Sequence, residues 1–146
     1  MLRGNHTARI DDKGRLKVPS QFRVLIEEQY GGHVFVTSLS GDYVRIYPMP
    51  VWEAIEARLT AMPSTHPTRV KFLDTVNYFG QSAELDSQGR ILVPPRLRET
   101  AAITGDVDVL GALTYLDVWN HERFAARLAQ NRLTDEDLGV LADAGI

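Results

Sequence analysis

Short runs of alternating apolar and polar residues separate longer runs in which apolar residues recur every three or four positions. The first pattern is typical of strands and the second of helices, so the chain is expected to be a mixed α+β protein. Strands are predicted near residues 6–10 and 15–18, and in two hairpins over 33–47 and 106–121. Between the first two strands, Asp11–Gly14 is predicted to form a tight turn in which the glycine adopts a positive φ.

Helices are expected where the apolar spacing is three or four and a capping residue or a proline stands at the start. The predicted helices begin at Pro19 or Ser20, at Pro50, after a connector over 63–68, at Pro94-Pro95, at Asn120 and at Thr134. Gly31-Gly32 is expected to end the first helix. The second helix is expected to bury a face made by Val51, Ile55, Leu59 and Met62, and the third to turn Val70, Leu73 and Val76 inward.

The chain contains an internal repeat. Residues 8–23 align without a gap on residues 83–98, and seven of the sixteen aligned positions are identical. A weaker echo follows in the two hairpins, where Tyr43, Ile46 and Tyr47 match Tyr115, Val118 and Trp119. We therefore divide the chain into two copies, 1–75 and 76–146.

One copy alone has too few residues to enclose a stable core, so the two copies are expected to share one core. Strands of one copy would then pair with strands of the other, and a pseudo-two-fold axis would relate the two tight turns. The predicted architecture is a common β-barrel formed by the two internal repeats and flanked by helices, with both turn tips on one edge.

Charge is unevenly distributed along the chain. The net charge is −3, but residues 1–23 hold six basic residues against two acidic ones, a local charge of +4. A basic end on an acidic body steers a polyanion such as double-stranded DNA toward one face. The alternative is that these six residues are merely a solvated surface. The chain also lacks the apolar segments of a membrane span or a secretory signal, so we expect a cytoplasmic protein. With DNA as its partner, the protein is expected to be nucleoid-associated.

The turn Asp11–Arg15 carries the most specific candidate chemistry. Asp11 and Arg15 stand on opposite arms of a narrow turn, where a bidentate ion pair would fix the hairpin and orient the guanidinium. Lys13 would lie at the tip. A β-ribbon fits the major groove of DNA, where an arginine bonds guanine O6 and N7, whereas Arg3, Arg9 and Lys17 are expected to contact phosphates.

The second copy repeats this turn with less positive charge. Asp86, Gly89 and Arg90 match the first turn, but Gln88 replaces Lys13, and residues 80–98 carry a net charge of only +1. The first copy is therefore expected to dominate DNA contact. For Asp11 and Asp86 a purely structural role as clamps is the leading interpretation.

The segment MLRGNHTARIDDKGRLKVPSQFR, together with the second copy LDSQGRILVPPRLR, resembles the MraZ family of bacterial transcriptional regulators, whose halves are AbrB-like swapped-hairpin units. The resemblance covers nearly the whole chain. It implies a double-hairpin barrel, ring-shaped homo-oligomers, and binding to repeated short DNA elements upstream of the cell division and cell wall gene cluster. It assigns DNA contact to Lys13, Gly14 and Arg15, and the second signature to Asp86, Gly89 and Arg90.

Other chemistry lacks its sequence signals. The chain has no cysteine, its four histidines are scattered, and no phosphate-binding or dinucleotide-binding glycine motif is present, so no metal, cofactor, small-molecule substrate or enzymatic activity is expected. Trp52, Trp119 and Phe124 are interpreted as core or subunit-contact residues. Two alternatives stay open: a transferase holding a small cationic substrate between Asp11 and Asp86, and a ring-forming scaffold whose acidic C-terminal helices recruit a partner.

Overall fold

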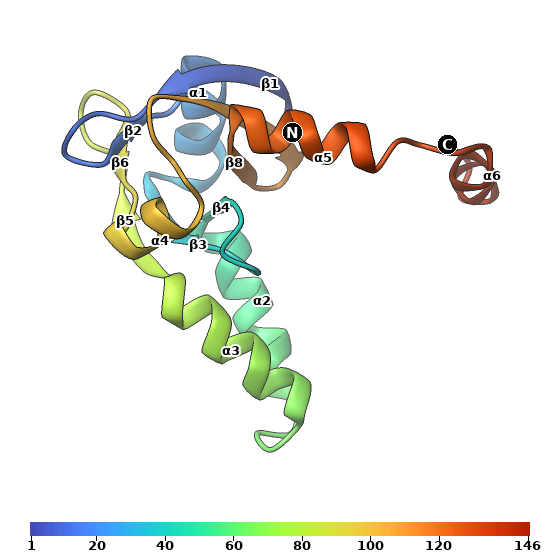
Figure 1. Cartoon of the computed structure of the whole chain (residues 1–146). Coiled ribbons are helices and arrows are strands. Elements are labelled where there is room, and N and C mark those ends of the chain that lie inside the picture. The colour runs from blue at the N-terminus through green and yellow to red at the C-terminus, as the bar shows by residue number, and fades with distance from the viewer.

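The computed structural model describes all 146 residues as an α+β fold of eight strands and six helices (Figure 1). The strands are β1 (Leu2–Arg9), β2 (Arg15–Lys17), β3 (His33–Thr37), β4 (Val44–Pro48), β5 (Gln81–Glu84), β6 (Arg90–Leu92), β7 (Asp106–Leu113) and β8 (Leu116–Asn120). The helices are α1 (Ser20–Tyr30), α2 (Met49–Ala61), α3 (Pro67–Phe79), α4 (Pro95–Thr100), α5 (His121–Gln130) and α6 (Asp135–Asp143).

Six strands form one antiparallel sheet in the order β1-β7-β8-β4-β3-β5, and β2 pairs with β6 in a separate two-stranded ribbon. Four of these pairings, β1 with β7, β2 with β6, β3 with β5 and β4 with β8, join a strand of residues 1–75 to a strand of residues 76–146. The two sequence copies are therefore interleaved through both sheets instead of lying side by side.

The structure does not show the expected barrel as one closed hydrogen-bonded ladder. The six-stranded sheet ends at β1 and β5, and the ribbon is a separate sheet. Each ribbon strand is only three residues long, and the chain reaches Pro19 or Pro94 two residues after the strand ends. A proline donates no backbone hydrogen bond, so neither strand extends far enough to complete a ladder to both edges of the sheet.

The predicted elements are present, with differences in the second and third helices. The one buried residue of α2 is Trp52, whereas the predicted face of Val51, Ile55, Leu59 and Met62 is only partly buried. α3 begins at Pro67, inside the expected connector, because the side chain of His66 caps it by accepting the amide of Thr68 at 3.1 Å. Val70 is 42% exposed and does not point inward as expected, whereas Val76 is fully buried. The reason is that α3 contacts the rest of the fold mainly through its C-terminal half, as Figure 1 shows.

The core consists of two apolar clusters on opposite faces of the large sheet. The larger one contains nineteen buried residues from the sheet, the ribbon, α1 and α4, and both sequence copies contribute to it. The smaller one lies under α2 and α3 and consists of Phe35, Tyr47, Trp52 and Val76. Phe35 and Trp52 stack with their ring centroids 4.5 Å apart, which anchors α2 to the sheet.

An ion pair lies where β4 and β8 meet, at paired positions 45 and 117. Arg45 Nε is 2.8 Å from Asp117 Oδ1, and Arg45 Nη2 donates to Asp117 Oδ2 at 3.2 Å. The guanidinium lies 4.2 Å from the ring centroid of Tyr115. Burial alone would lower the pKa of Arg45, but the hydrogen bonds with Asp117 and Tyr47 outweigh it and raise that pKa above its ordinary value.

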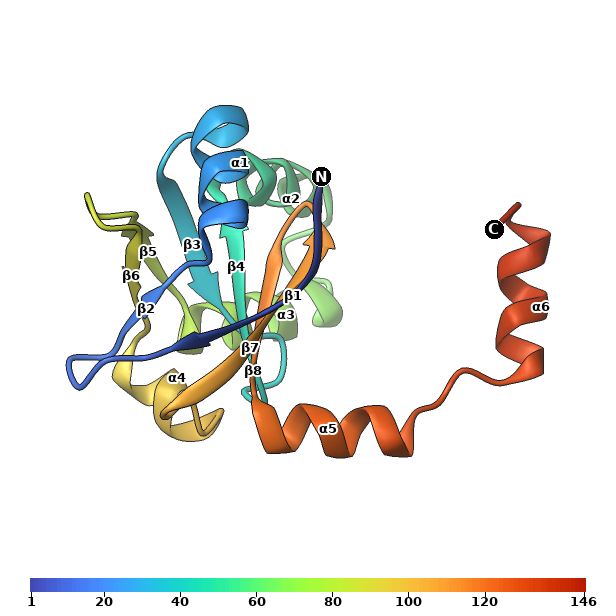
Figure 2. The same cartoon turned by 90° about the horizontal axis from the view of Figure 1, so that it is seen from above.

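The helices extend from the sheet in two directions. α2 and α3 form a pair that projects from one end of the body (Figure 1), whereas α5 leads away from it and places α6 apart from every other element (Figure 2). No helix in the structure is both long and apolar enough to span a lipid bilayer.

The ribbon offers a matched test of the core. Ile91 is fully buried, whereas its neighbour Leu92 is 45% exposed on the opposite face of β6. Ile91→Ala is expected to lower the free energy of unfolding by about 2–5 kcal/mol, because it removes buried methylene groups and leaves a cavity. Leu92→Ala is expected to change it by less than about 0.5 kcal/mol. Urea denaturation followed by circular dichroism measures both, and equal losses would contradict the inward placement of Ile91.

Candidate nucleic-acid interface

A single carboxylate holds the first tight turn. Asp11 Oδ1 accepts the backbone amides of Lys13 at 3.0 Å and Arg15 at 2.8 Å, and Asp11 Oδ2 accepts Arg15 Nε at 2.8 Å. Two backbone bonds close the same loop, from the Asp11 amide to the Arg15 carbonyl and from the Gly14 amide to the Asp11 carbonyl, both at 3.0 Å. These five bonds fix the turn and the direction in which the Arg15 side chain leaves it.

The second tight turn has the same bonds at equivalent positions. Asp86 Oδ1 accepts the amides of Gln88 and Arg90, each at 2.9 Å, and Asp86 Oδ2 accepts Arg90 Nε at 2.9 Å. The Asp86 amide donates to the Arg90 carbonyl at 3.1 Å, and the Gly89 amide to the Asp86 carbonyl at 3.0 Å. Both turns lie on the left in Figure 1, and Figure 2 shows them at opposite ends of the β2–β6 ribbon.

Gly14 connects the first turn to the second copy. Its φ is +82°, in the region that favours glycine, and its carbonyl accepts the amide of Val93 at 2.9 Å. The guanidinium of Arg98 lies directly over it, so that a Cβ at position 14 would come within 2.2 Å of Arg98 Cζ. Glycine is therefore needed both for the backbone conformation and for this close approach.

Gly89 makes the reciprocal connection. Its φ is +74°, its carbonyl accepts the amide of Val18 at 2.9 Å, and a Cβ there would lie 2.6 Å from Arg23 Cδ. Arg23 also donates from Nη2 to the Ser87 carbonyl at 3.0 Å, and pairs with Glu27 at 2.9 Å. An arginine from the helix of the other copy thus packs against each turn glycine, and in the second turn Arg23 also donates a hydrogen bond to the loop.

The outer face of the β2–β6 ribbon carries three cations. The middle residue of each strand is fully buried, so the flanking residues share the opposite face. On that face Lys17 is paired with Arg90, and Arg15 is paired with Leu92. The ribbon therefore brings Arg15 and Arg90, which lie 75 positions apart in the sequence, onto one small surface, on which Lys17 lies directly opposite Arg90.

Arg15 contacts its aspartate through fewer nitrogens than the sequence suggested. The expected bidentate pair is replaced by one side-chain contact through Nε, because the other oxygen of Asp11 accepts backbone amides. Nη1 and Nη2 of Arg15 have no hydrogen-bond partner, and the same holds for Arg90. The two arginine side chains are 32% and 26% exposed. Each guanidinium is thus oriented at its base and free at its tip.

The other cations suggested by the sequence are Lys13 in the first turn, Arg9 at the end of β1 that leads into this turn, and Arg3 near the opposite end of β1. Arg3, Lys13 and Lys17 are exposed and take part in no ion pair. Arg9 is also exposed but pairs with Asp106 of β7 at 3.2 Å. An exposed ion pair of this kind contributes little and exchanges readily with another anion.

Some important residues were not recognised from the sequence. Arg23 and Arg98 cover the two turn glycines, and their signal was their identity in the repeat alignment. Arg45 and Asp117 had no signal, because a pairing between distant strands depends on tertiary register. The histidines do not gather: no group of three or more histidine, aspartate or glutamate side chains is arranged to hold a metal ion.

The aspartates of the two turns have lowered pKa values. For Asp11 the main cause is the hydrogen bond from the backbone amide of Arg15, opposed by partial burial and reinforced by the Arg15 side chain. For Asp86 the main cause is the backbone amide of Arg90, with the same opposing and reinforcing groups. Because folding lowers each pKa below 3.8, their contribution to stability is complete above that pH and is lost as the pH falls through the folded-state value.

A carboxyl-carbon NMR titration tests this arrangement, with one turn as the control for the other. Arg15→Ala is expected to raise the pKa of Asp11 part of the way toward 3.8, since the backbone amide remains, and to leave the pKa of Asp86 unchanged. Arg90→Ala is expected to do the converse. An Asp11 midpoint that does not move in Arg15→Ala would show that the guanidinium contact is absent in solution.

Comparison of the chain with known proteins identifies its family. The chain matches the family described as "MraZ protein, putative antitoxin-like" over residues 1–75 and 80–138. It is 49% identical to the transcriptional regulator MraZ of Acidobacterium capsulatum and 50% identical to that of Koribacter versatilis, in each case over the full length of both proteins. It is 35% identical to the transcriptional regulator MraZ of Chromobacterium violaceum, over 93% of this chain and 92% of that protein. The resemblance noted in the sequence is confirmed, and the chain belongs to the MraZ family.

Proposed function

We propose that this protein is a sequence-specific DNA-binding transcriptional regulator that meets duplex DNA with the outer face of the β2–β6 ribbon. One observation carries the proposal: Arg15 and Arg90 are each oriented by an aspartate and keep two free guanidinium nitrogens on the same ribbon. A two-stranded ribbon fits the major groove, and the arginine fork matches guanine O6 and N7. The name of the relatives, transcriptional regulator, points to the same function.

The cations divide by role according to how they are held. Arg15 is fixed at its base, which suits base readout, whereas Lys13, Lys17 and Arg3 are exposed, take part in no ion pair and are suited to phosphate contact. Arg9 would join them by exchanging its exposed contact with Asp106 for a phosphate. Gly14 is buried beneath Arg98, so we assign it the role of shaping the turn that presents Lys13 and Arg15 to the DNA.

The first copy supplies most of this surface. Gln88 stands where the first turn has Lys13, and Leu92 stands where β2 has Lys17. Arg90 is nevertheless on the same ribbon face as Arg15, so we assign it a supporting contact with the same DNA segment. Asp86 then orients that second arginine as a structural clamp, and Gly89 supplies the positive φ that the turn requires.

We assign the fold to the AbrB-like swapped-hairpin type, with copies 1–75 and 76–146 sharing one core. The support is the reciprocal pairing of the copies, in which each turn glycine accepts an amide from the other copy. In this interpretation the short ribbon and the two edge strands of the large sheet take the place of a closed barrel, although no continuous hydrogen-bonded ladder joins them.

We further propose that the protein acts as a ring-shaped homo-oligomer on repeated short elements upstream of the cell division and cell wall gene cluster. One ribbon offers only a few base contacts, so a single element would be bound weakly. Several linked ribbons on spaced elements gain affinity through effective concentration. Binding to the bacterial chromosome would place the protein at the nucleoid.

The two other candidate functions differ in their support. The carboxylates of Asp11 and Asp86 are already filled by backbone amides and arginine side chains, which leaves no free acid to hold a cationic substrate for a transferase. A protein-interaction scaffold is favoured by one observation, the exposed acidic helix α6, and is compatible with DNA binding.

Substitutions of Arg15 and Lys17 distinguish sequence-specific base contact from nonspecific attraction to the DNA phosphates. Arg15→Ala is expected to remove about 1–3 kcal/mol of discrimination between the element and a scrambled duplex. Lys17→Ala is expected to weaken binding to both duplexes equally and to reduce the salt slope by about 1. Fluorescence anisotropy at two salt concentrations, with DNA from upstream of the gene, measures both. Unchanged discrimination in Arg15→Ala would refute the proposed readout.

The spacing of the elements tests the oligomer. A duplex with several elements at their natural spacing is expected to bind at least tenfold more tightly than a duplex with one element, whereas an array whose spacing is shifted by half a helical turn loses most of that gain. The half-turn shift leaves every base of the elements themselves unchanged, so it serves as the control. Equal affinity for one element and for the array would contradict binding by linked subunits.

A further inference from the structure

The C-terminal helix α6 has no partner in its own subunit. None of its residues is buried, and Leu138 and Val140 are 51% and 65% exposed. The helix is nevertheless well capped, because Thr134 and Asp137 form a reciprocal capping box. A nine-residue helix is too short to be stable alone in water, so its cap and apolar residues indicate that it is built to dock on a surface.

Comparison of the two sequence copies shows that α6 lacks the packing contact that α3 makes. In the first copy, β4 leads into α2, and the next helix, α3, folds back on it and buries Val76. In the second copy, β8 leads into α5, but the next helix, α6, stays extended away from the body (Figure 2). The connection 131–134 reaches at most about 14 Å when extended, and α5 directs it away from α2 and α3. A surface on another subunit is therefore the accessible one.

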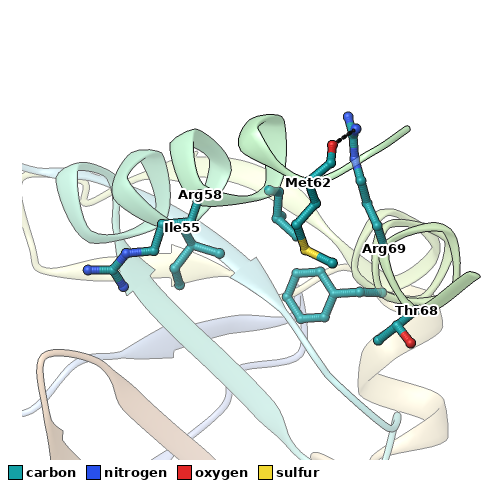
Figure 3. A pocket seen from close by; sticks show the side chains of 7 residues that line it. Ile55, Arg58, Met62, Thr68 and Arg69 are labelled. Atoms are coloured by element: carbon teal, nitrogen blue, oxygen red, sulfur yellow. Dashed lines mark hydrogen bonds between the residues drawn. The ribbon is translucent and has the colours of Figure 1, made fainter. Parts of the chain in front are cut away.

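A groove between α2 and α3 has the size and chemistry to receive the apolar side chains of such a helix. It has a volume of about 300 Å³, and its lining includes the apolar side chains of Leu59, Met62 and Phe72. Figure 3 shows Arg58 and Arg69 at opposite ends of it. No acidic residue lines this α2–α3 groove.

Both arginines of the groove have unused bonding capacity. Arg69 donates from Nη1 to the Met62 carbonyl at 2.8 Å, but its Nε is buried without an acceptor. An unsatisfied buried donor is costly, and a carboxylate brought to this guanidinium would offset that cost. Arg58 takes part in no ion pair or side-chain hydrogen bond within the subunit.

The α6 helix is complementary to the groove in charge and in apolar pattern. It carries four acidic residues and no basic one. Leu138 and Leu141 are three positions apart and share one face, whereas Val140 lies on the opposite face. An apolar stripe bordered by carboxylates matches an apolar groove bordered by two guanidiniums.

We propose that α6 of one subunit docks in the α2–α3 groove of a second copy of this chain. The two surfaces are different, so the contact is head-to-tail, and repetition of a head-to-tail contact closes a ring when the rotation permits. The inference therefore rests on the proposed ring and names the contact that forms it. It does not involve the DNA-binding turns.

Two variants that each destroy one side of this contact provide the test. The groove variant carries Arg58→Glu and Arg69→Glu, and the tail variant carries Leu138→Arg and Leu141→Arg. Each alone is expected to sediment as a monomer. Mixed in equal amounts, they are expected to form a complex of two chains and no larger, because only the groove of the tail variant and the helix of the groove variant remain intact. Analytical ultracentrifugation of the full-length proteins measures these masses.

Matched controls make the outcome specific. Val140→Arg, on the opposite face of α6, and Lys71→Glu, on α3 outside the groove, are expected to keep the mass of the unmodified protein. Because α6 touches nothing in its own subunit, the tail variant retains a folded body even if the groove variant does not. A tail variant with the full wild-type mass would overturn the docking contact and leave the ring and the DNA-binding proposals standing. A tail variant that binds one DNA element normally but gains nothing from an array would support it.

Discussion

The hydrogen bonds that cross between the two copies at the turn glycines hold the rest of the structure in place. The Gly14 carbonyl accepts an amide from the second copy, and the Gly89 carbonyl accepts one from the first. These bonds align β2 with β6, and this alignment puts Arg15 and Arg90 on one face. Without them each turn would be an isolated hairpin of marginal stability, and the two guanidiniums would have no fixed relation to each other.

Local chemistry could be predicted from the sequence, and distant pairing only in outline. The Asp-x-x-x-Arg turn could be predicted because all of its contacts lie within five residues. The repeat alignment led us to expect pairing between distant strands, and four strand pairs do join residues 1–75 to residues 76–146, but the alignment did not give their register. The exposure of Val70 was not predictable, because it depends on how far α3 lies from the sheet. The single contact between Asp11 and Arg15 was also missed, since helical and strand periodicity say nothing of which carboxylate oxygen the backbone amides occupy.

The ribbon and the projecting helices are suited to different physical tasks. At the ribbon, rigid turns hold partly exposed guanidiniums in fixed directions, which limits the entropy lost when they meet a ligand. Away from the ribbon, the exposed helix α6 and the apolar groove between α2 and α3 offer surfaces for protein contact. Because the duplicated halves have diverged, with Lys13 against Gln88 and a folded-back α3 against an extended α6, one chain supplies both tasks.

The ion pair between Arg45 and Asp117 bears on the origin of the duplication. The two residues are 72 positions apart, the offset at which Tyr43 and Ile46 match Tyr115 and Val118, and they pair with each other where β4 meets β8. In an ancestral dimer of identical halves, each of these positions would have faced itself, and a charged residue there would have met its own like charge. An arginine and an aspartate at these two positions therefore require halves whose sequences differ. The ion pair is a point at which the two copies depart from exact symmetry.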